Sequence, residues 1–224
     1  MAKDPVAGHA KTRLARDVGV AAAGHIASAL LEDTWKWVHN SPRFQPVLVL
    51  DRPPGIQGDR PLLVPSPTTW PQGTGDLGCK IGESLRRATL ANPSGALVVG
   101  SDAVGVPVDV LESAADHLDH GRAVIGPTED GGFYLLGLPR TPEPGLFAGI
   151  PWSTEGTERA TRNRLTEAGY EVESLPTWFD VDTVHDLVRL VELTRTRPER
   201  VPATRRLLED ETLRKVWPAS EQNA

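Results

Sequence analysis

Three aspartates at two places in the chain could together hold a divalent metal ion. Asp102 follows the apolar run 96–99, and Asp180 and Asp182 flank Val181. Residues two apart in a strand share a face, so Asp180 and Asp182 would point the same way. An acid just past a buried strand lies where open α/β sheets bind their ligands. Hard carboxylate oxygens suit Mg²⁺ or Mn²⁺, and such an ion usually serves to hold phosphates.

Each of these acids also has a plainer interpretation. Asp182 could be the N-cap of a helix that starts near Thr183, and Asp102 could be a turn acid after Ser101. The joint occurrence of the acids at strand ends favours the metal site over two unrelated local roles.

Two segments have the residue types that bind phosphates. In 8–13, Lys11 and Arg13 follow a glycine, so backbone and cations could approach a diphosphate together, although the spacing is not that of a Walker P-loop. In 73–78, three glycines precede a predicted helix, whose N-terminus favours an anion or a base edge. The alternatives are a solvated basic loop and an ordinary glycine-rich turn.

A third segment offers acids for proton transfer. Glu129 and Asp130 precede two glycines in a turn, where one carboxylate could orient or deprotonate an acceptor hydroxyl. The alternative is a tight turn with solvated acids. Trp152, after a proline, could line an acceptor pocket, although core packing is the commoner role of tryptophan.

Composition narrows the classes of function. The chain of 224 residues has a net charge of −6 and a pI near 5.5, which argues against a general nucleic-acid-binding surface. No apolar run is long enough for a membrane span, and the start lacks the apolar core of a signal peptide. A single cysteine, Cys79, rules out a disulfide within the chain. We therefore expect a cytoplasmic enzyme.

Strands and helices alternate along the chain. Apolar runs predict strands over 46–51, 96–99, 123–126, 133–137 and 171–175, with a short one at 62–64. Helical spacing and caps predict helices over 20–39, 81–90, 108–118, 153–168, 183–194 and 199–216, and 183–186 resembles a capping box with Asp in place of Glu. This order is typical of an α/β fold with a mostly parallel sheet and helices on both faces. We expect one domain over 1–198 and a helical appendix with a loose tail over 199–224.

Six ordered motifs resemble the DUF2064 family. They are 2–14 with its Ala-Lys-Asp-Pro start, Gln-Gly-Thr-Gly-Asp-Leu-Gly at 72–78, Gly-Ser-Asp at 100–102, the Glu-Asp-Gly-Gly-Phe-Tyr run within 126–135, Pro-Trp at 151–152 and Asp-Val-Asp-Thr at 180–183. Members of this family are usually described as glycosyltransferase-like proteins of the GT-A, or nucleotide-diphospho-sugar transferase, fold. The related 2-phospholactate guanylyltransferases look similar at 11–14 and 180–183.

The resemblance implies roles for these residues. Asp102, Asp180 and Asp182 would hold Mg²⁺ or Mn²⁺, and Lys3, Lys11 and Arg13 would contact the donor phosphates. We expect Gly75, Asp76 and Gly78 to contact the nucleotide, and Tyr134 and Trp152 to line the acceptor pocket. Asp130, with Glu129, would assist the acceptor hydroxyl.

Three functions follow as hypotheses. The first is a metal-dependent transferase that joins a nucleotide-activated donor, most simply a nucleotide sugar, to a small-molecule acceptor. The second is a nucleotidyltransferase that joins a nucleoside triphosphate to a phosphate or carboxylate. The third is a non-catalytic nucleotide-binding paralogue. The donor base, the sugar, the acceptor and the oligomeric state are open.

The family usually has an apolar strand before the Ala-Lys-x-Pro segment, and here only Met1 precedes that segment. We therefore expect the first strand of the sheet to be truncated and 2–5 to form a loop. An upstream extension of about five to eight residues, the usual length of a strand, would complete it.

Overall fold

A computed structural model describes residues 1–6, 8–52 and 63–210 of the chain. It divides into two compact units, each described by itself here. Unit 1 comprises residues 1, 70–100 and 107–179, and unit 2 comprises 2–69, 101–106 and 180–224.

A four-stranded sheet forms the centre of unit 1. Its strands lie in the order β4-β6-β5-β7, and their bounds are β4 (Ala96–Val99), β5 (Ala123–Pro127), β6 (Phe133–Leu138) and β7 (Val172–Ser174). Strand β6 is antiparallel to β4 and β5, whereas β5 and β7 are parallel. Three of the four strands therefore run in one direction, which confirms the predicted mostly parallel α/β sheet.

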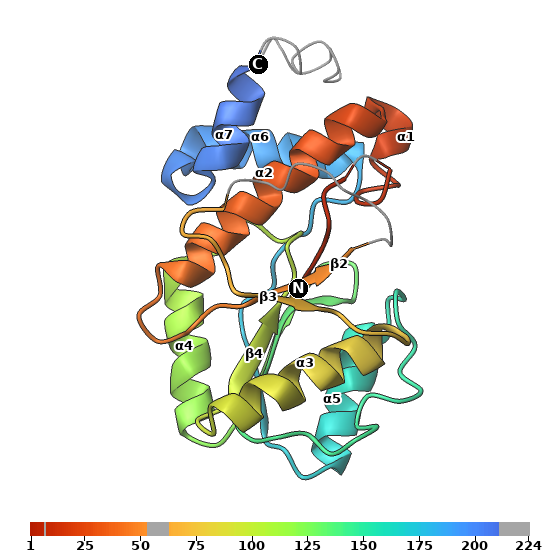
Figure 1. Cartoon of the computed structure of the whole chain (residues 1–224), viewed down its shortest axis with the longest axis vertical. Helices are drawn as coiled ribbons and strands as arrows, with labels where there is room; N and C mark the ends of the chain where they lie inside the picture. Colours follow the sequence, from red (N-terminus) through yellow and green to blue (C-terminus); the bar gives the residue numbers. More distant parts are fainter. Residues whose placement is uncertain (7, 53–62, 211–224) are drawn as a thin grey trace. The chain divides into compact units, whose positions relative to one another are not determined.

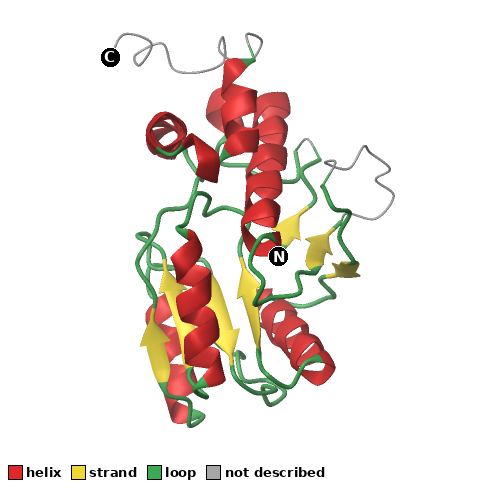
Figure 2. Cartoon of the chain, turned by 90° about the vertical axis from the view of Figure 1, so that its left-hand side faces the viewer, coloured by secondary structure: helices red, strands yellow, loops and turns green. Residues whose placement is uncertain are grey.

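Helices cover both faces of this sheet (Figure 2). Side chains of α3 (Leu77–Ala91) and α5 (Thr157–Glu167) share one core with strand residues that include Ile125, Leu136 and Leu138. Helix α4 (Val108–Asp119) packs on the opposite face, where Leu118 approaches the backbone of Gly137. The alternating orientation of strand side chains gives each face its own apolar layer.

Unit 2 is mainly helical (Figure 1). Its helices are α1 (Ala15–Val18), α2 (Val20–His39), α6 (Val184–Thr196), a 3₁₀ turn η1 (Pro198–Arg200) and α7 (Pro202–Glu209). Helix α2 covers the predicted range 20–39, and α6 opens on the predicted capping box of Thr183 and Asp186.

The start of the chain differs from the expected loop. Strand β1 (Ala2–Lys3) pairs in parallel with β2 (Leu48–Asp51), with Ala2 opposite Leu50. The backbone N–H of Asp4 then donates to Asp51 O at 2.9 Å. The prediction of a loop over 2–5 was therefore wrong for residues 2 and 3. A polar side chain such as that of Lys3 does not prevent a strand from pairing at a sheet edge.

Helix α7 is held against α2 by a buried carboxylate. Asp33 of α2 accepts hydrogen bonds from the backbone N–H groups of Ala203 and Thr204 at 2.7 and 2.8 Å, and this satisfies donors that the first turn of α7 leaves free. Part of the predicted helix 199–216 is thus formed, while 211–216 lie outside the described residues. The boundary expected at 198/199 stays a prediction.

The predicted strand at 62–64 is not formed in its described part. Residue 62 lies outside the described residues, and Leu63 and Val64 are irregular. Strand β3 (Thr69–Pro71) instead continues the order β1-β2-β3, and Leu48 N donates to Thr68 O at 2.9 Å. Among the described residues, no helix has the length and apolarity needed to cross a membrane.

Candidate functional site

Unit 2 brings one lysine and two of the predicted acids together. Lys11 Nζ lies 2.7 Å from Asp102 Oδ1 and 3.0 Å from Asp182 Oδ1. The Lys11 side chain is 4% exposed, whereas those of Asp102 and Asp182 are 51% and 37% exposed. A buried ammonium is thus shared by two carboxylates that solvent and ligands can still reach.

The two carboxylates keep this ammonium charged. Burial by itself lowers the pKa of Lys11, but the attraction of Asp102 and Asp182 and their hydrogen bonds outweigh it, so the pKa of Lys11 lies above its ordinary value. Lys11 is therefore a permanent cation at neutral pH.

The backbone around Lys11 is fixed by local contacts. Lys11 has a φ of +54°, a left-handed conformation that costs energy for a residue with a side chain and is found at functional sites. Its carbonyl accepts the N–H of Ala15 at 2.8 Å as α1 begins, and the His9 ring nitrogen Nε2 lies 3.2 Å from Asp51 O at the end of β2. These contacts hold the loop from both sides.

The acids are positioned by a second set of contacts. Val181 N donates to Asp102 O at 3.0 Å, which ties the segments around 102 and 182 together. Asp186 Oδ2 accepts the N–H groups of Asp182 and Thr183 at 3.0 and 2.7 Å. Asp186 is thus a positioning residue that sequence analysis identified only as part of the capping box.

The strand implied around Asp182 is not formed, whereas the capping box predicted at Thr183 is. Residues 179–183 do not form a strand, although the expected alternation persists because Val181 is buried while Asp180 and Asp182 are half-buried. The N-cap of α6 is Thr183 and not Asp182, and Asp186 completes its capping box. Asp182 is therefore free of the cap role that was the alternative to ligand binding.

The carboxylates of Asp102 and Asp182 together suit a hard cation. Within the described part of the chain, no three His, Cys, Asp or Glu side chains are grouped as metal ligands, so Asp180 does not complete a three-carboxylate site there. Asp102 and Asp182 do converge, and the Lys11 ammonium shows that their oxygens can bind one cation together. Carboxylate pairs of this kind hold Mg²⁺ with water completing the shell, so the residues fit the predicted metal. The metal itself stays a prediction.

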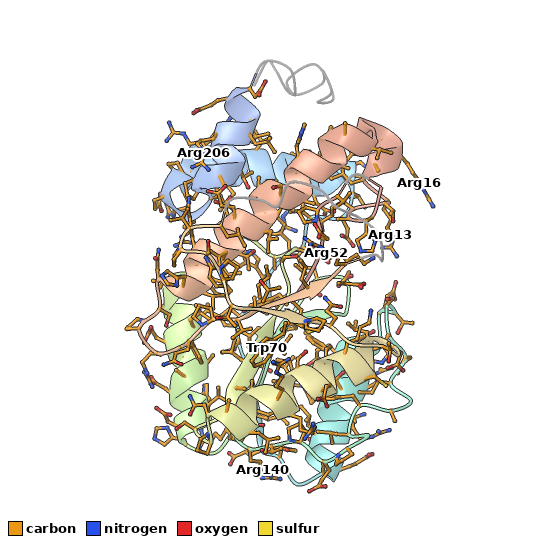
Figure 3. All side chains as sticks on the ribbon, in the orientation of Figure 1. Arg13, Arg16, Arg52, Trp70, Arg140 and Arg206 are labelled. Carbon is orange, nitrogen blue, oxygen red and sulfur yellow. The ribbon has the colours of Figure 1, made fainter. Side chains whose placement is uncertain are left out.

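The other predicted phosphate contacts are more exposed. Arg13 Nη1 lies 3.8 Å from Asp182 Oδ2, and the Arg13 side chain is 67% exposed. Figure 3 labels Arg13 in the loop before α1, and Arg16 extends outward from that helix. Lys3 is exposed on β1. Arg13 therefore belongs to the cluster formed by Lys11, Asp102 and Asp182. The role of Lys3 stays a prediction.

In unit 1, the glycine-rich turn opens helix α3. Asp76 is its N-cap and accepts the backbone N–H of Cys79 at 2.8 Å. Gly75 has a φ of +95°, and a Cβ there would lie 2.8 Å from Cys79 Cβ. A Cβ at Gly78 would lie 2.8 Å from the Trp152 ring. Each of these residues thus has a structural role, and their contact with a nucleotide stays a prediction.

The acidic turn is built by Asp130 itself. Asp130 Oδ1 accepts the Thr128 hydroxyl at 2.6 Å and the N–H of Gly132 at 3.0 Å. Gly131 O accepts the N–H of Glu158 at 2.8 Å, which docks the turn on the first turn of α5. Glu129 and Asp130 are both exposed. The turn presents two acids to solvent on a rigid support, as an acid–base role would need.

The two aromatic residues predicted for an acceptor pocket pack within unit 1. Tyr134 is buried, and its hydroxyl donates to Pro176 O at 3.0 Å. Trp152 is half-buried and meets Phe133 edge-on, with ring centroids 6.2 Å apart. These contacts favour packing roles, and acceptor contact stays a prediction for both.

Comparison with known proteins gives two findings and one absence. The crystal structure of a "putative nucleotide-diphospho-sugar transferase" from Desulfovibrio desulfuricans G20 is similar, with a TM-score of 0.78 and 29% sequence identity, over 96% of this chain and 94% of that one. No curated protein matches the chain. The model of the family described as "Uncharacterized protein conserved in bacteria (DUF2064)" matches residues 34–154, more than half of the sequence, and the chain belongs to this family.

Proposed function

We propose that this protein is a metal-dependent transferase that takes a sugar from a nucleotide-diphospho-sugar and passes it to a hydroxyl group of a small acceptor. The observation that carries the proposal is the buried Lys11 ammonium held between the accessible carboxylates of Asp102 and Asp182. A diphosphate suits such a cluster, because it needs cations directly and can also bring a metal ion bound to its oxygens. The name of the similar Desulfovibrio protein supports the same donor class.

Each residue of the cluster has a task in this proposal. Lys11 and Arg13 donate charge-assisted hydrogen bonds to the donor phosphates. Asp102 and Asp182 would hold Mg²⁺ or Mn²⁺, and the ion would supply Lewis-acid neutralisation of the leaving diphosphate. Asp186 keeps the backbone of Asp182 in place. A role for Asp130 of unit 1 in accepting the proton of the acceptor hydroxyl stays a prediction of the sequence.

Ligand binding tests the proposal before the acceptor is known. A panel of nucleotide sugars and nucleoside triphosphates is added with and without Mn²⁺, and thermal unfolding is followed, because a ligand of the folded state raises its stability. We expect a Mn²⁺-dependent rise for at least one nucleotide sugar, and loss of that rise in Asp102→Asn. If no nucleotide sugar stabilises the protein with or without Mn²⁺, the proposal is wrong.

Product analysis then separates the two transfer reactions. A glycosyltransferase releases a nucleoside diphosphate from its donor, whereas a nucleotidyltransferase releases pyrophosphate from a nucleoside triphosphate. We expect nucleoside diphosphate. Release of pyrophosphate alone would show that the protein transfers a nucleotidyl group and not a sugar at the same phosphate site.

A further inference from the structure

We infer that Lys11 is an internal cation that excludes a free divalent metal from the Asp102–Asp182 pair, so that the metal binds together with a diphosphate ligand. The inference rests on the proposed function and adds to it an order of binding. It assigns to Lys11 a task in the ligand-free protein that is separate from its contact with phosphate.

First, a single nitrogen atom, Lys11 Nζ, contacts both carboxylates. Lys11 Nζ lies 2.7 Å from Asp102 Oδ1 and 3.0 Å from Asp182 Oδ1, which are hydrogen-bond distances for a charged pair. A metal ion bound between the same two Oδ1 atoms would need the place that the ammonium occupies. The ammonium and the metal are therefore competitors for one place.

The second support is the charge balance of the cluster. Lys11 cancels one of the two carboxylate charges, and the Arg13 guanidinium, 3.8 Å from Asp182 Oδ2, reduces the remainder. A divalent ion entering beside an ammonium meets repulsion that a partly buried site screens less than water does. We therefore expect the ligand-free protein to bind Mn²⁺ weakly.

Third, burial and the local backbone hold Lys11 in place. Its side chain is 4% exposed, so the ammonium has little water to replace a lost carboxylate. The left-handed backbone at Lys11 and the hydrogen bond from Ala15 N to its carbonyl limit where the side chain can start. A diphosphate is the ligand that changes this balance, because its oxygens give the ammonium a new anionic partner and bring the metal with them.

The inference predicts a positive coupling between Mn²⁺ and a nucleoside diphosphate. If each ligand strengthens the binding of the other, the factor must be the same in both directions. Mn²⁺ affinity is measured by electron paramagnetic resonance of the free ion, with the protein alone and with UDP or GDP, after correction for the complex that these nucleotides form with Mn²⁺.

Lys11→Met is the decisive variant, because it removes the charge and keeps much of the length. We expect it to bind Mn²⁺ alone about tenfold or more tightly than the wild type, and to lose most of the coupling with the nucleotide. Lys11→Arg retains the charge and should keep Mn²⁺ binding weak. Lys36→Met, which removes a lysine paired with Glu32 on α2, should leave Mn²⁺ affinity unchanged.

The outcomes are distinguishable. Equal Mn²⁺ affinity in the wild type and Lys11→Met overturns the inference and leaves the metal site standing. Absence of Mn²⁺ binding in every variant, with and without nucleotide, overturns the metal part of the proposed function as well. If Lys11→Met does not fold, the wild-type coupling decides: a Mn²⁺ affinity that UDP and GDP do not change overturns the inference, and a rise of about tenfold supports it.

Discussion

The indole ring of Trp152 lies against the backbone of Gly78 in the first turn of helix α3. A Cβ at Gly78 would stand 2.8 Å from Trp152 Cζ2 and 2.7 Å from the carbonyl oxygen of Phe147. Real Cβ atoms do not approach other heavy atoms so closely, so only glycine allows this packing. The last glycine of the turn is thus explained within unit 1 by a contact between a helix and the loop that carries Trp152.

We predict that Gly78→Ala destabilises the protein. Overpacking against the indole and a backbone carbonyl should cost about 1–3 kcal/mol, more than the benefit of removing a glycine from a helix. Gly82→Ala on the same helix is the matched control, because its Cβ would lie 3.3 Å from Phe147 Cδ2, farther than the contacts of a Cβ at Gly78. Urea denaturation measures both, and equal stability of the two variants would contradict the close Gly78–Trp152 contact.

We predict a pH-dependent loss of stability in Asp76→Ala. The hydrogen bond from the Cys79 N–H holds the pKa of Asp76 below its ordinary value. Because the folded-state pKa is lowered, the stabilisation is present above the unfolded pKa of about 3.9 and is lost as the pH falls through the folded pKa. The melting temperature of Asp76→Ala should therefore lie below that of the wild type at pH 7 and approach it in acid.

Asp76→Asn separates capping from ligand binding, because Asn caps helices as well as Asp does. We expect near wild-type stability at pH 7. If this variant keeps its stability but loses affinity for nucleotide sugars, the carboxylate of Asp76 contacts the ligand. Unchanged affinity would leave Asp76 with its cap alone.

We predict that Tyr134 remains protonated far into alkaline pH. Burial raises the pKa of Tyr134 to about 12. Since the unfolded tyrosine ionises near 10, this stabilisation is complete below about pH 10 and is lost as the pH rises toward the folded pKa. Absorbance at 295 nm should show a tyrosinate step near pH 12 that is absent in Tyr134→Phe. A step near pH 10 assigned to Tyr134 would contradict its burial.

Much of the fold could be predicted from local sequence pattern. The run 96–99 is apolar, and its strand has these bounds in the structure. The spacing of apolar residues in 20–39 and the Thr183–Asp186 pair also specify their helices locally. Patterns of this kind succeed because neighbouring residues supply the cap or the buried face.

The arrangement of the cluster could not be predicted in the same way. Lys11, Asp102 and Asp182 are far apart in the sequence, and no local pattern indicates that the lysine fills the place between the acids. Strand β1 was missed for a related reason, since its pairing with β2 depends on the backbone of a distant segment. The weak signal that did exist was the pair of cations Lys11 and Arg13 beside a glycine, in a loop where the structure gives Gly8 and Lys11 positive φ angles.

We predict that Asp182→Asn weakens both the fold and the metal-dependent binding of ligand. The structure shows that Thr183 caps α6, so the change leaves the cap intact and acts on Lys11. The buried ammonium would keep Asp102 but exchange a charged partner for an amide, which should cost about 1–3 kcal/mol in the free energy of unfolding. Mn²⁺-dependent affinity for a nucleotide sugar should fall at least as far as in Asp102→Asn, because each variant leaves a metal only one carboxylate of the pair.

Asp17→Asn on α1 is the control, since it removes an exposed acid of the same unit. It should change neither stability nor metal-dependent binding. The two measurements on Asp182→Asn test different claims. Lost stability with full Mn²⁺-dependent affinity would make Asp182 a structural partner of Lys11 alone. Lost affinity with full stability would mean that Lys11 finds a replacement partner. The carboxylate of Asp182 would then be needed for ligand binding and not for the stability of the fold.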